Sequence, residues 1–104
     1  MIVIEAAASG KVIHKSSDTG YGNMLIIKHD HGLETYYAHL NKFHNNIQVG
    51  KQVQAVETIG YVGSTGHSTG PHLHYEVWKE FIAVDPLIYF PEYARVDLTS
   101  SYYD

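Results

Sequence analysis

Two histidines separated by one residue, His72 and His74, stand at the start of a largely apolar stretch. In a β-strand, alternate side chains point to opposite faces, so His72, His74 and Glu76 share one face and the residues between them point into the core. Same-face neighbours have α-carbons roughly 6.6–6.8 Å apart. One imidazole could therefore bind a metal ion while the other reaches a water molecule beside it. Taken alone, the pair also fits a solvated polar face, and that alternative stays open.

The segment before this pair is rich in glycine. Residues 63–71 read GSTGHSTGP, with three glycines and one proline. Such a composition lets the backbone approach a bound chain closely and leaves N–H groups available to bind it. This loop favours a functional site beside the two histidines.

A third candidate, His39, stands at the end of a predicted strand over residues 34–39. In a strand, His39 would share a face with Thr35 and Tyr37. A histidine at a strand end can point toward a neighbouring site, but from this segment alone His39 fits a surface or capping residue better.

Other histidines are less informative. His29 and His31 flank Asp30 and have the spacing of metal ligands, but Asp30 to Gly32 is typical of a turn between two strands, which we favour. The remaining histidines have no partner at ligand spacing, and we expect them to be surface residues; they are His14, His44 and His67.

The elements that position these side chains are predicted to be β-strands. Apolar and polar residues alternate with a period of two, and no long helical stripe is present. The pattern predicts an all-β fold with strands near residues 3–7, 11–15, 23–29, 34–39, 58–63 and 72–79. Short connections rich in glycine favour antiparallel neighbours. Val49 to Lys51 is typical of a turn, and Asn41 to Asn45 could form a single helical turn.

Composition limits the remaining possibilities. A chain of 104 residues that is 44% apolar can bury one modest core, so we expect a single domain. No apolar run approaches the roughly 18 residues of a membrane helix, and no basic start suggests a signal peptide. The absence of cysteine excludes disulfides and cysteine-based zinc sites. The net charge of −4 argues against binding to nucleic acid phosphates.

Several segments together resemble a known family. They are residues 7–12 (AASGKV), 20–23 (GYGN), 37–40 (YAHL), 49–50 (VG), 59–63 (IGYVG) and 63–74 (GSTGHSTGPHLH). Over about residues 2–90 the sequence resembles the zinc metalloendopeptidases of the lysostaphin and LytM type, which cut the peptide part of bacterial peptidoglycan. The resemblance implies a compact antiparallel two-sheet β domain with an open groove over residues 1–90. Residues 91–104 would then be an acidic, tyrosine-containing tail or linker.

The resemblance also implies roles for individual residues. His74 would bind zinc, His72 would accept a proton from the attacking water, and His39 would steady that water or the developing oxyanion. Part of the glycine-rich loop would bind the substrate peptide in extended form, namely Ser64, Thr65, Gly66, Ser68, Thr69 and Gly70.

Two departures from the family pattern bear on function. The family's other zinc ligands, a histidine and an aspartate, lie in an N-terminal motif that has no match here, so this chain alone is expected to be inactive. A preceding segment or a second chain could supply them. At Val56, the family pattern leads us to expect a glycine.

The expected function is therefore zinc-dependent hydrolysis of peptide bonds in peptidoglycan once these ligands are supplied. The alternatives are a non-catalytic module that binds peptidoglycan or activates another hydrolase, and a structural domain of a phage virion or tail. The expected location is the cell envelope, the extracellular space or a phage particle, without membrane insertion.

Overall fold

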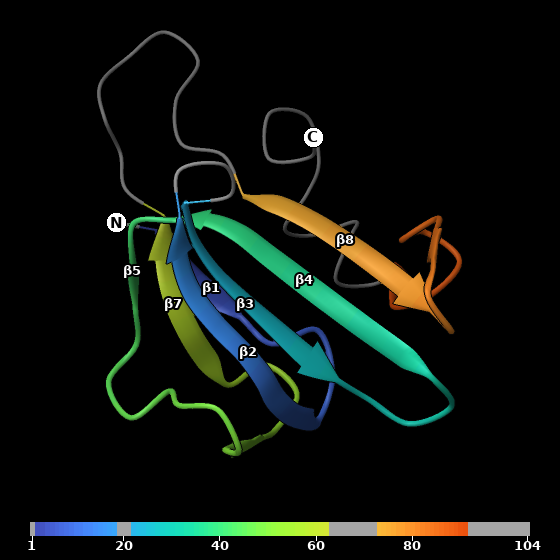
Figure 1. The fold of residues 1–104 in the computed structure, drawn as a ribbon, viewed down its shortest axis with the longest axis horizontal. Coiled ribbons are helices and arrows are strands. Elements are labelled where there is room, and N and C mark those ends of the chain that lie inside the picture. Colours follow the sequence, from blue (N-terminus) through green and yellow to red (C-terminus); the bar gives the residue numbers. More distant parts are fainter. Residues whose placement is uncertain (1, 19–21, 63–72, 92–104) are drawn as a thin grey trace, which may run out of the picture.

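The computed structural model describes residues 2–18, 22–62 and 73–91, and these form two antiparallel sheets (Figure 1). The predicted all-β, two-sheet fold is confirmed. Within the described ranges, no helix is long and apolar enough to cross a membrane. The expected tail lies, apart from Pro91, outside the described residues.

The larger sheet has the strand order β6-β2-β3-β4-β8-β9, and Figure 1 shows its long strands side by side. Its strands span Gln52–Val53 (β6), Gly10–Asp18 (β2), Gly22–Lys28 (β3), Leu33–Leu40 (β4), His74–Lys79 (β8) and Ile82–Val84 (β9). The smaller sheet has the order β1-β7-β5, and its strands span Ile2–Glu5 (β1), Thr58–Val62 (β7) and Lys42–Phe43 (β5).

The main hydrophobic core joins the two sheets. It combines Ile4 and Ile59 of the smaller sheet with Leu25, Tyr37 and other inward-facing residues of the larger one. Burying such side chains contributes about 1.5–3 kcal/mol each, because their apolar surface leaves water. The larger sheet therefore turns one face to this core, which leaves its opposite face for the candidate site.

The six predicted strands are present with shifted ends, but three short strands escaped prediction. They are β5, β6 and β9, each only two or three residues long. The suggested helical turn at Asn41 to Asn45 is wrong. Asn41 N–H donates to the Tyr61 carbonyl and His44 N–H to the Ile59 carbonyl, so this segment pairs with β7. The turn predicted around Gly50 is confirmed by its φ of 98°.

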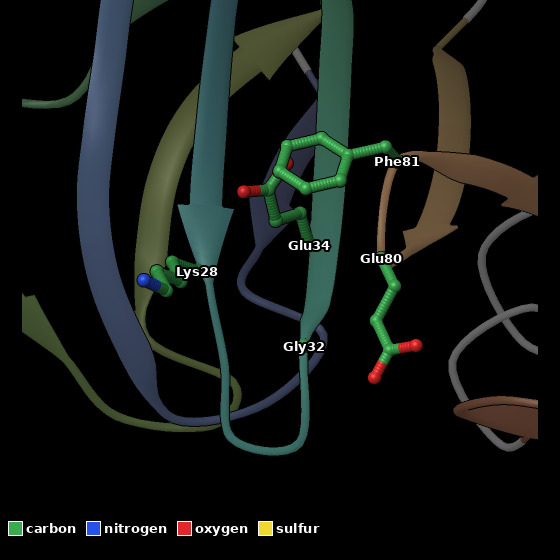
Figure 2. Close-up of a pocket in the computed structure, with 5 residues that line it drawn as sticks. All are labelled: Lys28, Gly32, Glu34, Glu80 and Phe81. Atoms are coloured by element: carbon green, nitrogen blue, oxygen red, sulfur yellow. The ribbon is translucent and has the colours of Figure 1, made fainter.

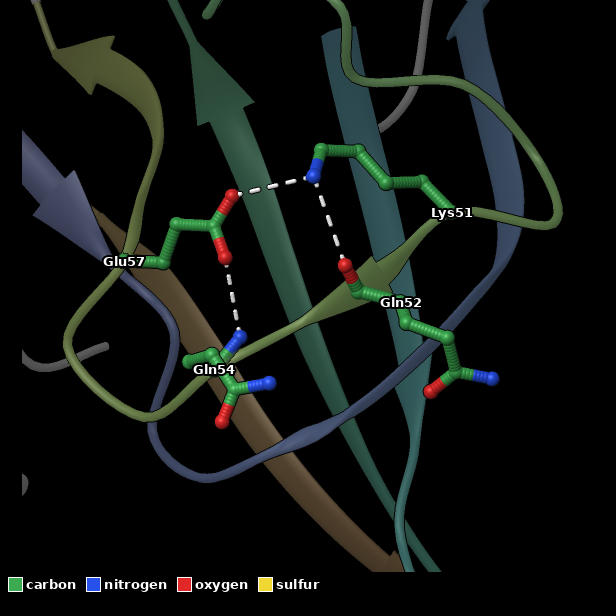
Figure 3. Close-up of polar contacts among 4 residues, drawn as sticks. All are labelled: Lys51, Gln52, Gln54 and Glu57. Carbon is green, nitrogen blue, oxygen red and sulfur yellow. Dashed lines mark hydrogen bonds and ion pairs between the residues drawn. The ribbon is translucent and has the colours of Figure 1, made fainter.

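Val56 adopts a left-handed backbone, with φ of 61°, where the family pattern leads us to expect glycine. It is the third residue of a turn from Gln54 to Glu57, closed by the Glu57 N–H on the Gln54 carbonyl at 3.1 Å. Figure 3 shows how the Glu57 carboxylate braces this turn. It accepts from the Gln54 N–H at 2.9 Å and pairs with Lys51 at 3.1 Å. These contacts hold a β-branched residue in a conformation that it disfavours.

Replacing Val56 by glycine should stabilise the fold. Removing the left-handed Cβ clash gains roughly 1–2 kcal/mol, and the extra freedom of glycine in the unfolded chain takes back about 0.4–1 kcal/mol. The matched control is Val49→Gly, because Val49 is similarly exposed (61% against 67%) but has no positive φ. Urea unfolding should show Val56→Gly at or above wild-type stability and Val49→Gly below it. Equal losses in both variants would contradict the strain at Val56.

Candidate functional site

The structure brings His39 and His74 together across neighbouring strands. β4 pairs with β8 so that Ala38 lies opposite His74. The two imidazole rings have centroids 5.7 Å apart and meet nearly edge to face, at 78°. Two of the three histidines predicted to act in one site are thus neighbours, although 35 positions separate them in the sequence.

His39 reaches this position by leaving the alternation of its strand. The sequence placed it on the face of Thr35 and Tyr37, and this prediction is wrong. Thr35 and Tyr37 are fully buried in the core, whereas His39 is exposed. Its φ of 61° and a register irregularity in the β3–β4 pairing turn the backbone at this point. The left-handed residue re-aims the side chain, as β-bulges commonly do.

The turned end of β4 is held by β3. The Asn23 side-chain amide donates to the carbonyls of Leu40 and Asn41, each at 3.0 Å. Gly22, with φ of 66°, packs beside His39, and a Cβ on it would lie 3.7 Å from the His39 α-carbon. These contacts, all from β3, hold the backbone at His39 and at the two residues that follow it.

His74 stands on the outer face of β8. As predicted, the alternating residues Leu73, Tyr75 and Val77 are buried in the core. His74 is part-buried, and its Nε2 lies 2.6 Å from Oε2 of Glu76. Sequence reasoning placed Glu76 on this face but gave it no role. Its position two residues after His74 was the signal that could have assigned one.

The remaining predicted site residues cannot be placed. His72 and the substrate-binding candidates between Ser64 and Gly70 lie outside the described residues. Within the described ranges, no three His, Asp or Glu side chains converge as metal ligands. His74 has the donor chemistry of a zinc ligand, because a neutral imidazole held by a carboxylate is a common zinc ligand in proteins.

The His29 and His31 pair belongs to a turn, as we favoured. His31 and Gly32 have φ of 63° and 74°, and the Leu33 N–H donates to the Asp30 carbonyl at 3.3 Å across them, so they are the two central residues of the turn. Positive φ at both central residues is the geometry of a tight type I′ hairpin turn. His29 itself is buried, with only 8% of its surface exposed.

Both ring nitrogens of His29 are used in a buried chain of hydrogen bonds. Nδ1 lies 2.7 Å from the Ser9 carbonyl, and Nε2 lies 2.8 Å from the Thr35 hydroxyl. The Thr35 hydroxyl lies 2.6 Å from that of Tyr37, which accepts from the Ala7 N–H at 3.0 Å. His29 therefore supports the fold and is not a metal ligand here.

The protonation states of the groups in this chain of hydrogen bonds follow from what its two ends can donate or accept. The Ser9 carbonyl can only accept, so Nδ1 of His29 carries the proton. Burial lowers the pKa of His29, so Nε2 stays unprotonated and accepts from Thr35. Burial raises the pKa of Tyr37 to about 12, so its O–H remains and donates to Thr35. Every hydrogen bond in the chain is satisfied only while His29 is neutral.

Two hollows in the described part of the surface lie near the β3–β4 turn, at the end of β4 away from His39. One, of about 160 Å³, is lined by Lys28, Gly32, Glu34, Glu80 and Phe81 (Figure 2). The other, of about 270 Å³, is lined by residues that include Ser9, His29 and Phe90. Neither hollow includes His39 or His74.

Comparison with known proteins identifies the domain. Residues 3–86 match the model of peptidase family M23. The chain belongs to this family. The predicted resemblance to lysostaphin-type peptidases is thereby confirmed, together with the fold that it implied.

Relatives extend the comparison. The chain is 46% identical over 84 residues to the DD-carboxypeptidase/endopeptidase Mpg of Neisseria meningitidis, covering 81% of this chain and 19% of that protein. It is 42% identical over 81 residues to the peptidoglycan DD-endopeptidase ShyC of Vibrio cholerae, covering 77% of this chain and 18% of ShyC. The chain thus spans about a fifth of the length of these relatives.

A solved structure gives the same result. The catalytic domain of the antimicrobial peptidase lysostaphin from Staphylococcus simulans superimposes with a TM-score of 0.70 and 32% identity. The match covers 86% of this chain and 71% of that domain. Family M23 is a metallopeptidase family, and a relative from Buchnera aphidicola, 36% identical over 83 residues, is described as a metalloprotease.

Acid should destabilise the fold through His29. Because burial lowers its folded pKa below the ordinary value of 6.5, the unfolded chain binds the proton first as pH falls. The stabilisation is complete above about pH 6.5 and is lost below it, with a slope of up to about 1.4 kcal/mol per pH unit.

Urea unfolding at a series of pH values between neutral and mildly acidic measures this slope. The slope attributable to His29 should disappear in His29→Gln and persist in His31→Gln, which alters an exposed neighbour. An unchanged slope in His29→Gln would assign the acid sensitivity to another group.

Proposed function

We propose that this domain is the peptidase part of a zinc-dependent endopeptidase that hydrolyses peptide bonds of bacterial peptidoglycan. Membership of peptidase family M23 supports the reaction class. The relative ShyC, a peptidoglycan DD-endopeptidase, supports a peptidoglycan substrate. The observation that carries the proposal is the proximity of the His39 and His74 rings, 5.7 Å apart, because each ring belongs to a segment that carries the family resemblance, residues 37–40 and 63–74.

His74 would hold the metal ion. Because no three ligand side chains converge among the described residues, the other ligands would come from elsewhere, as a histidine and an aspartate would in the family. When bound, zinc supplies a Lewis acid that polarises the scissile carbonyl and lowers the pKa of water toward about 7. A lone imidazole cannot supply a zinc site, since catalytic zinc takes three protein ligands.

The remaining residues would handle the proton, the charge and the substrate. His72 would accept the proton of the attacking water and return it to the leaving amine. His39, exposed at the end of β4, would donate to the oxyanion that develops on the carbonyl. The loop from Ser64 to Gly70 would hold the stem or cross-bridge peptide in extended form. The enzyme would act in the cell envelope or outside the cell.

The two histidines of the His72 and His74 pair should respond differently to alanine. The test uses a zinc-loaded protein in which this domain is completed by the missing histidine and aspartate ligands. In that protein, His74→Ala should lose both metal and peptidoglycan hydrolysis, because it removes a ligand. His72→Ala should keep the metal and lose about 10²–10⁴ in rate, because it removes only a general base. His14→Ala is the control, since His14 contacts Ser16 and no site residue in the described structure.

Metal analysis and hydrolysis of purified sacculi distinguish the two variants. Loss of zinc from His72→Ala with retention in His74→Ala would reverse the two roles. A wild-type protein that holds zinc but cleaves no peptidoglycan peptide would overturn the proposed function.

His39 should affect the rate without affecting the metal. The best replacement is asparagine, because it tolerates the left-handed backbone that His39 adopts. His39→Asn should lower kcat by about 10²–10³ and leave zinc content and KM nearly unchanged, because oxyanion stabilisation is absent from the ground state. The control is His31→Asn, the same replacement at another exposed histidine with φ near 60°.

Melting temperature and kcat should be measured on the same preparation. If His39→Asn were destabilised but fully active per folded molecule, His39 would be a packing residue with no part in catalysis.

A further inference from the structure

Glu76 links two side chains on the outer face of β8. Its Oε2 lies 2.6 Å from Nε2 of His74, and its Oε1 accepts from the indole N–H of Trp78 at 2.8 Å. The three residues occupy alternate positions of one strand and therefore share a face. Both carboxylate oxygens are engaged, one on each side.

Trp78 is itself held in place from the neighbouring strand. Its ring stacks on that of Tyr36, with centroids 5.5 Å apart and an interplanar angle of 30°. The register of the sheet sets Tyr36 of β4 opposite Glu76 of β8. Because the indole N–H can only donate, Oε1 of Glu76 accepts from it, and the carboxylate is held at both of its oxygens. The aromatic pair thus anchors the far side of the group that contacts His74.

This arrangement selects one form of the His74 ring. A carboxylate oxygen accepts hydrogen bonds, so Nε2 of His74 must carry the hydrogen that it donates to Oε2 of Glu76. A metal ion would then bind through Nδ1. In metalloproteins, a ligand histidine commonly donates its second N–H to a carboxylate, which orients the ring and makes it more basic.

We propose that Glu76 is a positioning residue that sets the tautomer and orientation of His74, with Trp78 and Tyr36 anchoring its carboxylate. The proposal rests on the proposed function in one respect, the role of His74 as a metal ligand. Glu76 touches neither substrate nor metal in this assignment and acts through His74.

The first experiment needs no metal. Nitrogen-15 NMR of the histidine side chains in the 104-residue chain, recorded at mildly alkaline pH, reports which ring nitrogen of His74 carries the hydrogen. Wild type should show His74 protonated at Nε2. Glu76→Gln offers one carbonyl oxygen to two donors, so it should give a mixture of tautomers, and Glu76→Ala should do so more fully. An unchanged His74 tautomer in both variants would overturn the proposal.

The control is Glu34→Gln. Glu34 lies on β4 two residues before Tyr36, and the variant makes the same change of charge on the same sheet. It should leave the His74 tautomer unchanged. Thermal unfolding of all variants separates loss of orientation from loss of fold, because a misfolded variant loses the dispersion of every histidine signal.

The second experiment measures zinc affinity by competition with a chelator, in the protein in which this domain is completed by the other zinc ligands. Glu76→Gln should weaken zinc binding by about 10- to 100-fold, while Glu34→Gln should match wild type. In the cobalt-substituted protein, the visible absorption should change in Glu76→Gln, which a purely structural role would not produce. Complete loss of zinc, as expected for His74→Ala, would instead make Glu76 a ligand and overturn the proposal.

The two hypotheses fail separately. If wild type shows the Nε2-protonated ring, Glu76→Gln disturbs it and no preparation binds zinc, the proposed function falls and the orientation of His74 by Glu76 stands. If zinc binds and peptidoglycan is cut, but Glu76→Gln changes neither tautomer nor affinity, the positioning role falls and the function stands.

Discussion

The pairing of β4 with β8 is the constraint on which the site depends. Six residue pairs in continuous register, from Leu33 with Lys79 to Ala38 with His74, set the two strands side by side. A slip of one residue would send His74 into the core and expose Tyr75, because side chains alternate in a strand. The buried Tyr75 and Val77 resist that slip, so packing on the inner face fixes chemistry on the outer face.

The same strand is anchored on its inner face by polar contacts. Tyr37 and Thr35 of β4 join the buried hydrogen-bond chain that runs from the Ala7 N–H to His29 and the Ser9 carbonyl. An unsatisfied member of such a chain would cost about 1–3 kcal/mol, so the chain allows few other arrangements. It ties β4 to the segment between β1 and β2, and thereby to the smaller sheet. The strand that carries His39 is held from both sheets.

The sequence predicted the strands that bury a full face and missed those that do not. Along β8 and the residue before it, the alternation of Leu73, Tyr75 and Val77 was readable, because burial requires it. By contrast, β5 and β6 hold two residues each, too few to show a period. β9 carries the exposed Ile82 (66% exposed), so its pattern does not report burial. Short strands exist because neighbours offer them hydrogen bonds, and that information lies elsewhere in the chain.

The candidate site was predictable in composition but not in geometry. His39 and Val56 have the same φ of 61°. The periodicity of the sequence does not predict a left-handed backbone at either residue. Their consequences differ, because Val56 is exposed in a turn whereas the turned backbone of His39 brings its ring to His74. Left-handed residues cost energy wherever they occur, so position alone does not identify a functional one. What distinguishes His39 is that its left-handed backbone brings its ring beside that of His74. In a regular strand that imidazole would be buried beside Tyr37, and the candidate site would lose its second histidine.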